Sequence, residues 1–168
     1  MIFDVLKSRW LRKEQDKIRK ENRLRNASKP SSMVVLYNAD AEKSTLFIEQ
    51  WAKALGIEEV TLVGMTKDAQ ATSSANHIYL HSKSLKWSGG IADIHLENLL
   101  KSKVDLQINY FKEAEALIYY VALALRVDFK VGFPTQDVEL YDLAIDTSLD
   151  QKELFIAELK KYLNIITT

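Results

Sequence analysis

The chain has 168 residues, 23 basic and 23 acidic side chains, no net charge and no cysteine. The lack of cysteine excludes disulfides, thiolate metal sites and cysteine nucleophiles, and it is typical of proteins from a reducing compartment. No apolar run reaches the roughly 18 residues of a transmembrane segment. Arg9, Arg12 and Lys13 interrupt the apolar stretch that a secretory signal requires. We therefore expect a soluble, cytoplasmic protein.

The balanced charge hides an uneven distribution. Residues 1–29 contain ten lysine or arginine residues and four acidic residues, which gives this segment a net charge of +6. Because the whole chain is neutral, the other 139 residues carry −6. This division predicts a basic helical arm at 1–29 and an α/β domain at 30–168.

The first 25 residues or so are expected to form one long helix, because strong helix formers dominate and no glycine or proline interrupts them. At helical spacing, one side of its first turns carries Ile2, Phe3, Leu6 and Trp10, and basic residues follow from Arg9 onward. Three roles are compatible with this pattern. The helix docks peripherally on the inner face of a membrane, it contacts RNA, or it packs on its own domain or on a second copy.

Strands and helices are predicted to alternate after the linker at residues 26–32. A continuous apolar run at 33–37 indicates a central parallel strand. A helix is expected over 42–55, with Leu46, Phe47, Trp51, Ala54 and Leu55 facing inward and Gly56 ending it. Further strands are expected at 59–64 and 77–81, separated by a loop, and a short helix at 91–101.

The stretch from 104 to 134 gives the strongest signal of fold class. A strand at 104–111 leads into an apolar helix at 114–125 and a second strand at 129–134. A helix that is apolar on most of its faces must be buried, and a crossover helix packed on a sheet is the common case. A strand at 142–146 and a helix at 150–163 complete the chain, with Leu154, Phe155, Leu159 and Leu163 buried and Ser148 or Asp150 as its cap.

This order predicts a three-layer, doubly wound, Rossmann-like domain with a mostly parallel sheet of five to six strands. Two connections leave strand direction open. Residues 134–142 are few for a helical crossover, so an antiparallel last strand is one alternative. Residues 65–76 show no helical pattern, so the direction of the third predicted strand is open as well.

Ligands of such sheets bind beyond the carboxyl ends of the strands. The polar residues expected there include a group contributed by the first and fourth predicted strands: Asn38, Asp40, Asn109, Tyr110 and Lys112. Neighbouring positions for these strands would place Asn38 near Asn109, around a polar ligand. Alternatively, the same residue types cap helices and shape turns.

Motifs for other chemistry are lacking. The sequence contains no glycine-rich nucleotide loop and no nucleophile elbow, and Ser88-Gly89-Gly90 is a weak candidate for anion binding. His77, Tyr79 and His81 alternate on one face of a predicted edge strand, but two histidines lack the third ligand that a metal site needs. We therefore predict no metal, no cofactor and no catalytic residues.

The strand at 104–110, the apolar helix, Lys130-Val131-Gly132-Phe133-Pro134 and Asp142-Leu143-Ala144-Ile145-Asp146-Thr147 resemble a family of short bacterial proteins of unknown function. The resemblance extends over most of the chain and implies no activity. More loosely, residues 104–134 are similar to the acceptor-side half of heptosyltransferase-type glycosyltransferases. Those enzymes place the sugar-nucleotide site largely in a second domain, which has no counterpart in this sequence.

Two functions follow as expectations. The first is a non-enzymatic interaction or adaptor module whose arm docks on a partner protein or an anionic surface, membrane or RNA, through Ile2, Phe3, Leu6, Arg9, Trp10, Arg12 and Lys13. The alternative is a small ligand-binding protein or enzyme, related to half of a glycosyltransferase, with its site at the carboxyl ends of the first and fourth strands.

Overall fold

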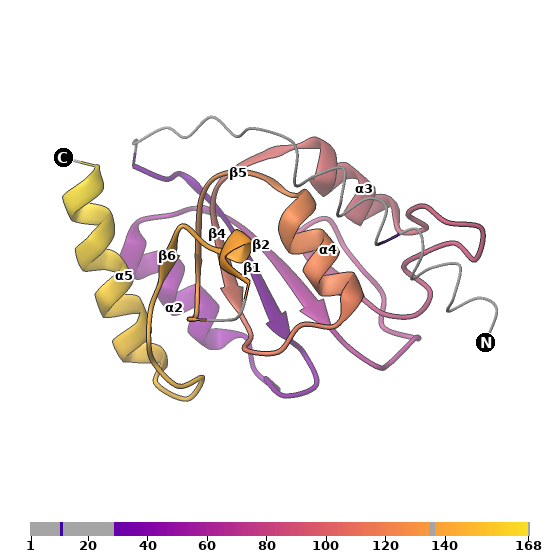
Figure 1. Ribbon diagram of the computed structural model, residues 1–168, viewed down its shortest axis with the longest axis horizontal. Coiled ribbons are helices and arrows are strands. Elements are labelled where there is room, and N and C mark those ends of the chain that lie inside the picture. The colour runs from indigo at the N-terminus through magenta and orange to yellow at the C-terminus, as the bar shows by residue number, and fades with distance from the viewer. Residues whose placement is uncertain (1–10, 12–28, 135–136, 168) are drawn as a thin grey trace.

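The computed structural model describes Leu11, residues 29–134 and residues 137–167. Six strands form one sheet in the order β3-β2-β1-β4-β5-β6, and every neighbouring pair is parallel (Figure 1). The strands are β1 (Ser32–Asn38), β2 (Glu59–Met65), β3 (His77–Leu80), β4 (Lys103–Tyr110), β5 (Arg126–Gly132) and β6 (Leu143–Ala144). The helices of the described residues are α2 (Leu46–Leu55), α3 (Ile94–Lys101), α4 (Ala116–Ala124) and α5 (Lys152–Ile166), with a 3-10 turn η1 (Val138–Leu140).

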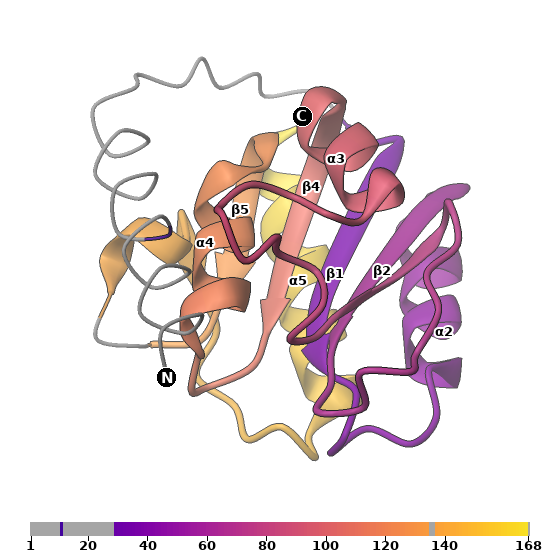
Figure 2. The same cartoon turned by 90° about the vertical axis from the view of Figure 1, so that its right-hand side faces the viewer.

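The helices form two layers around the sheet. Helices α2 and α5 cover one face, and α3 and α4 cover the other (Figures 1 and 2). This arrangement confirms the predicted doubly wound, Rossmann-like fold, and the strand order is the one typical of that class. Strand β1 pairs with both β2 and β4, so the point where the winding direction changes lies between β1 and β4.

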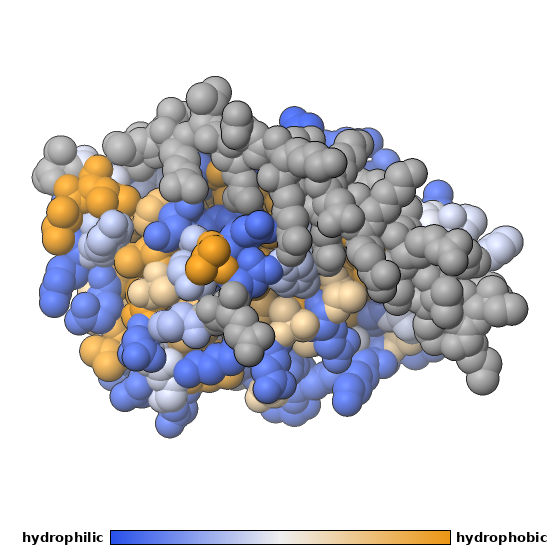
Figure 3. All heavy atoms as spheres, in the orientation of Figure 1, coloured by the Kyte–Doolittle hydropathy of each residue, from blue (hydrophilic) through white to orange (hydrophobic). Residues whose placement is uncertain are grey.

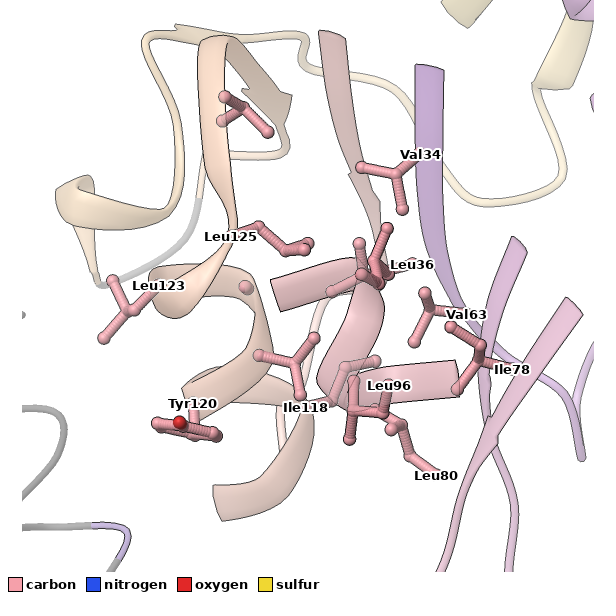
Figure 4. Close-up of a cluster of buried hydrophobic side chains, with 14 of the residues drawn as sticks. Val34, Leu36, Val63, Ile78, Leu80, Leu96, Ile118, Tyr120, Leu123 and Leu125 are labelled. Atoms are coloured by element: carbon pink, nitrogen blue, oxygen red, sulfur yellow. The ribbon is translucent and has the colours of Figure 1, made fainter. Parts of the chain in front are cut away.

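The core on the α3/α4 face explains the apolar sequence of α4. Side chains of β1, β2 and β3 meet those of α3 and α4 in one cluster, which includes Leu36, Val63, Leu96 and Ile118 (Figure 4). Leu11 is only 5% exposed and belongs to the same cluster. Residue 11 of the N-terminal segment therefore contributes to the core of the domain.

The core on the α2/α5 face is largely aromatic. Trp51 of α2 contacts Phe47, Tyr110 and Phe155, with ring centroids 4.9 to 5.2 Å apart. The indole N–H of Trp51 donates to the backbone oxygen of Lys152 at 3.2 Å, which joins α2 to the start of α5. Aromatic pairs of this kind stabilise a fold beyond the area that they bury.

The helix ends follow local chemistry, and three orientation predictions were wrong. Gly56 adopts the left-handed conformation (φ 69°) and ends α2 as predicted. Leu46 and Ala54 of α2 and Leu154 of α5, predicted to be buried, are exposed because each lies on the solvent side of its helix. Helix α2 begins four residues later than predicted, because the turn after β1 continues through Glu42.

The predicted cap of α5 was also wrong. The hydroxyl of Ser148 is bonded to the carboxylate of Asp150, and the backbone N–H of Ser148 donates to Oε1 of Gln151 at 2.9 Å. These bonds stay within the turn before α5. The helix begins after Gln151, whose side chain makes no capping bond.

The two strands whose direction the sequence left open, β3 and β6, are both parallel to their neighbours in the sheet. Strand β6 pairs with β5 in parallel, so the antiparallel alternative is wrong. The short link between β5 and β6 is sufficient for two reasons. The turn η1 passes over the α4 face of the sheet, where Leu140 is buried in the core cluster, and β6 has only two residues. The β2–β3 link has no helix, and the backbone N–H of Leu62 and the oxygen of Asn76 bring β3 directly beside β2.

Candidate functional site

The predicted ligand residues at the end of β1 are held by the turn that follows it. Oδ1 of Asn38 accepts from the backbone N–H groups of Asp40 and Ala41, at 3.0 and 3.3 Å. The carboxylate of Asp40 accepts from the Thr66 hydroxyl at 2.7 Å and from the Lys67 N–H at 2.9 Å. These two bonds hold the pKa of Asp40 below its ordinary value. Asn38 thus stabilises the β1 turn itself, and Asp40 fastens that turn to the loop after β2.

The predicted residues on β4 point to opposite faces of the sheet. Asn109 is buried on the α4 face, where its Oδ1 accepts from Nε2 of Gln107 at 2.7 Å and its Nδ2 donates to the Leu140 oxygen at 2.6 Å. Tyr110 lies on the α2/α5 face and donates to the Leu149 oxygen. Lys112 lies beyond the strand, with Nζ 5.2 Å from the ring centre of Phe133.

The five predicted ligand residues are therefore divided among three places. Asn38 and Asp40 lie in the turn after β1, Asn109 contacts η1, and Tyr110 and Lys112 lie near the start of α5. The first and fourth strands are neighbours as predicted, but alternation along β4 separates Asn109 from Tyr110. The ligand-binding role stays a prediction, and the bonds themselves are those of turns and core.

A buried polar cluster lies beneath α4 that the sequence analysis missed. Gln107 of β4 and Lys130 of β5 are neighbours in the sheet, both are almost fully buried, and both donate to the backbone oxygen of Ala122. Ala122 is in the last turn of α4, where carbonyl groups lack helical partners. The lysine also suits the negative end of the helix dipole. Polar residues inside two otherwise apolar strands were the sequence signal.

A second missed relationship joins β1 to β3. The Tyr37 hydroxyl lies 2.7 Å from Nε2 of His77, and the His77 ring stacks on Tyr79 with centroids 4.4 Å apart. Desolvation lowers the pKa of His77, and burial raises the pKa of Tyr37 above its ordinary value. Both shifts favour the uncharged forms, so at neutral pH the contact is a hydrogen bond between a neutral imidazole and a protonated phenol. The sequence had indicated that His77 and Tyr79 share a face, but not that Tyr37 reaches them.

The histidines do not form a metal site within the part of the chain that the structure describes. No group of three or more potential metal ligands is found among these residues. His81 instead contacts the Ala71 oxygen through Nε2 at 3.0 Å, and Asp93 caps α3 through the N–H groups of His95 and Leu96. Asp93 and His95, the nearest further metal ligands in the sequence, thus belong to the start of a helix.

A basic groove opens at the amino ends of the strands, where α2 and α5 end. It has a volume of about 340 Å³, and three exposed lysines, Lys29, Lys53 and Lys160, are among its lining residues. No acidic residue is among the ten residues that line it. Lys29 is the last residue of the basic N-terminal segment, so the positive charge of that segment continues on the domain.

The lysines of the basic groove are not needed to close the end of α2. The backbone N–H of Gly56 donates to the Lys53 oxygen at 3.2 Å, and that of Ile57 donates to the Ala52 oxygen at 2.9 Å. At the end of α5, the backbone N–H and the hydroxyl of Thr167 both donate to the Leu163 oxygen. Since backbone and hydroxyl groups already satisfy these carbonyls, the three cationic groups remain available to an anion.

The predicted docking residues of the arm (Ile2, Phe3, Leu6, Arg9, Trp10, Arg12 and Lys13) lie outside the described residues. Between them, Leu11 is described and buried. Within the described ranges, no helix is long and apolar enough to cross a lipid bilayer.

Comparison with known proteins identifies a family and no individual relative. Neither the curated proteins nor the solved structures gave a match. The looser similarity to heptosyltransferases therefore stays a prediction. The model of a family of unknown function, DUF6913, matches residues 6–166, which include nearly the whole chain. The chain thus belongs to the DUF6913 family, in agreement with the resemblance seen in its sequence.

Proposed function

We propose that the protein is a non-enzymatic interaction module that docks on an anionic surface through its basic N-terminal segment, residues 1–29. One observation carries the proposal: Lys29, the end of that segment, lines the same groove as Lys53 and Lys160. The groove extends the basic charge of the segment onto the folded domain. Docking would then involve both the segment and the end of the domain to which it is attached.

The charge of the groove favours an anionic partner. Three lysines around one groove of about 340 Å³ repel one another, and no acidic residue among its lining residues offsets them. A phosphate-bearing surface would relieve this repulsion, with an affinity that falls as salt screens the charges. The net −6 of residues 30–168 makes this local excess of positive charge a departure from the rest of the domain.

Among anionic surfaces, the sequence favours a lipid headgroup layer. Ile2, Phe3, Leu6 and Trp10 precede or interleave with Arg9, Arg12 and Lys13. Apolar and tryptophan side chains insert at the membrane interface while basic residues meet anionic lipid. RNA would use the basic residues alone, and an acidic partner protein would need no insertion.

The polar residues at the carboxyl ends of the strands also favour an interaction module over a ligand-binding protein or enzyme. Asn38, Asp40 and Asn109 are engaged in the protein's own hydrogen bonds. Their side chains stabilise turns and the core, which accounts for their presence without a ligand. This engagement favours docking over chemistry at that edge of the sheet.

Vesicle binding tests the proposal on the full chain. Wild type is expected to cosediment with vesicles that contain phosphatidylglycerol, and not with phosphatidylcholine alone. The double variant Lys53→Glu/Lys160→Glu should bind about thirtyfold more weakly or worse, because each lost lysine near the surface removes about 1 kcal/mol of attraction. The matched control is Lys83→Glu/Lys86→Glu, which changes the same charge on the exposed loop after β3, at the opposite end of the sheet.

Three results would overturn this assignment. Equal loss in both double variants would indicate an effect of net charge rather than of the basic groove. Binding to a single-stranded RNA oligonucleotide, with no binding to anionic vesicles, would replace the lipid surface with RNA. If Lys53 and Lys160 have a purely structural role, the double variant will have a lower free energy of unfolding but will bind vesicles as wild type does. That result would also contradict the proposal.

A further inference from the structure

Helix α5 carries an apolar stripe that is exposed in the part of the chain that the structure describes. Leu154, Tyr162 and Ile165 are 45%, 38% and 67% exposed, and they recur at the spacing of one helical face. Figure 3 shows an apolar cluster at the upper left of the molecule, where Figure 1 places the C-terminal end of α5. An exposed apolar patch on a soluble domain commonly marks an interaction site.

The stripe borders a groove between α5 and the edge of the sheet. This α5–β6 groove has a volume of about 390 Å³, and Leu154, Tyr162 and Ile165 line it together with Leu143 and Ala144 of β6. Strand β6 is the last strand in the sheet order, so its outer edge has no strand beside it within the described residues. Proteins usually cover or protect such edges. The stripe and the edge form one continuous face.

The charges in the middle of the stripe point to a second copy of the same chain. Glu158 and Lys161 lie between Leu154 and Ile165, line the α5–β6 groove, and are 47% and 70% exposed at their side chains. Within one chain they form an exposed intrahelical ion pair at 3.5 Å, which the pairs with a second copy would extend or replace. The spacing from Leu154 to Glu158 equals that from Lys161 to Ile165, so the pattern inverts about the point between residues 159 and 160. A two-fold axis there would set two α5 helices antiparallel.

This symmetry makes the face complementary to itself. Leu154 of one copy would face Ile165 of the second copy, and Glu158 would face Lys161 of the second copy, with each contact occurring twice. The stripe spans about 16 Å along the helix, which is long enough for two antiparallel helices to pack side by side. Closed two-fold pairing is also the commonest form of homo-oligomer.

We propose that the α5–β6 face is the interface of a symmetric homodimer, in which the α5 helices of two copies pair antiparallel. Leu154, Tyr162 and Ile165 supply its apolar contacts. Glu158 and Lys161 fix the antiparallel register through two equivalent intermolecular ion pairs. The inference goes beyond the proposed docking function and does not depend on it, because the basic groove lies on a different side of α5.

Sedimentation equilibrium of the full-length protein tests the interface by charge exchange. Wild type is expected to have twice the monomer mass. Glu158→Lys alone and Lys161→Glu alone should each weaken dimerisation about tenfold or more, because each single reversal turns two attractive pairs into two repulsive ones. Mixing these two variants should restore a dimer, since the mixed pair regains both attractive contacts.

A matched control and an apolar variant complete the test. Lys101→Glu reverses the lysine of a comparable intrahelical pair with Glu97 on α3 and should leave the dimer unchanged. Leu154→Gln should weaken the dimer and leave the fold intact, because this side chain is largely exposed. A monomer at every concentration overturns the proposal. A dimer that ignores the reversals, or a mixture of the two variants that stays monomeric, overturns it as well.

Discussion

The hydroxyl of Tyr37 on β1 lies 2.7 Å from Nε2 of His77 on β3, although β2 runs between these two strands. The contact is made across Gly64, which pairs with Tyr37 in the sheet and has no side chain to block the tyrosine ring. A Cβ at Gly64 would lie 3.0 Å from Cζ and from the hydroxyl oxygen of Tyr37. One glycine thus allows two polar aromatic groups on separate strands to meet.

The first prediction concerns this glycine. Gly64→Ala should lower the free energy of unfolding by about 1–3 kcal/mol, because the added methyl group overpacks against Tyr37 and Ala39. Urea denaturation measures the change. Gly132→Ala is the matched control, since a Cβ there meets its nearest neighbour at 3.5 Å, an ordinary contact. Equal effects at both glycines would contradict the crossing of β2 by the Tyr37 ring.

The second prediction concerns the pH dependence of stability. Desolvation holds the pKa of His77 below its unfolded value of about 6.5, so the unfolded chain binds the proton more readily than the folded one. The stabilisation associated with neutral His77 should therefore be complete above that value and be lost as the pH falls. The difference in free energy of unfolding between wild type and His77→Gln should shrink from about pH 7.5 to about pH 5.5.

The carboxylates of the protein also titrate in acid, so this comparison needs a histidine control. His95→Gln, on α3, removes a histidine at the start of a different helix. The change with pH measured for this variant is the background against which the change for His77→Gln is read. A difference for His77→Gln that grows on acidification would contradict the lowered pKa.

The third prediction separates two adjacent residues of α2. Phe47→Ala should cost about 3–5 kcal/mol, because Phe47 is 8% exposed and contacts the rings of Trp51 and Tyr110. Leu46→Ala should change the free energy of unfolding by no more than about 0.5 kcal/mol, since its side chain is 56% exposed. Tryptophan fluorescence during denaturation reports both values. Similar costs would mean that α2 is rotated from the orientation described.

The fourth prediction concerns the two asparagines that the sequence placed in one site. Asn109→Ala should destabilise the fold by about 1–3 kcal/mol, because it leaves the buried Leu140 oxygen without this donor. Asn38→Ala should cost about 1 kcal/mol or less, since its bonds to Asp40 and Ala41 are exposed to solvent. Melting temperatures measured by calorimetry show which of the two variants is less stable. A variant of Asn109 as stable as wild type would reopen the question of a ligand role there.

The sequence predicted those parts of the fold that depend on composition and period. The apolar runs of β1 and α4 indicated burial on both sides, and Gly56 indicated the end of α2; all three are confirmed. The direction of β6 was not predictable from loop length, because a single 3-10 turn at Val138–Leu140 replaces a crossover helix.

The candidate site was harder to predict because it depends on which face each residue occupies and on contacts between distant strands. Neighbouring strands β1 and β4 were predicted, yet alternation puts Asn109 and Tyr110 on opposite faces. The approach of Tyr37 to His77 requires a glycine in the intervening strand, which no local pattern reveals. The basic groove joins residues that are more than a hundred positions apart in the chain, Lys29 and Lys160.

The most direct test of the docking function neutralises the segment itself in the full-length protein. Deletion of residues 1–29 would also remove the buried Leu11 from the core, so substitution separates binding from folding. The measurement is cosedimentation of wild type and of Arg9→Gln/Arg12→Gln/Lys13→Gln with anionic vesicles over a range of salt concentrations. The account predicts salt-sensitive binding by wild type and a roughly hundredfold loss in the variant at low salt. Equal binding by the two proteins, or binding that salt does not weaken, would contradict it.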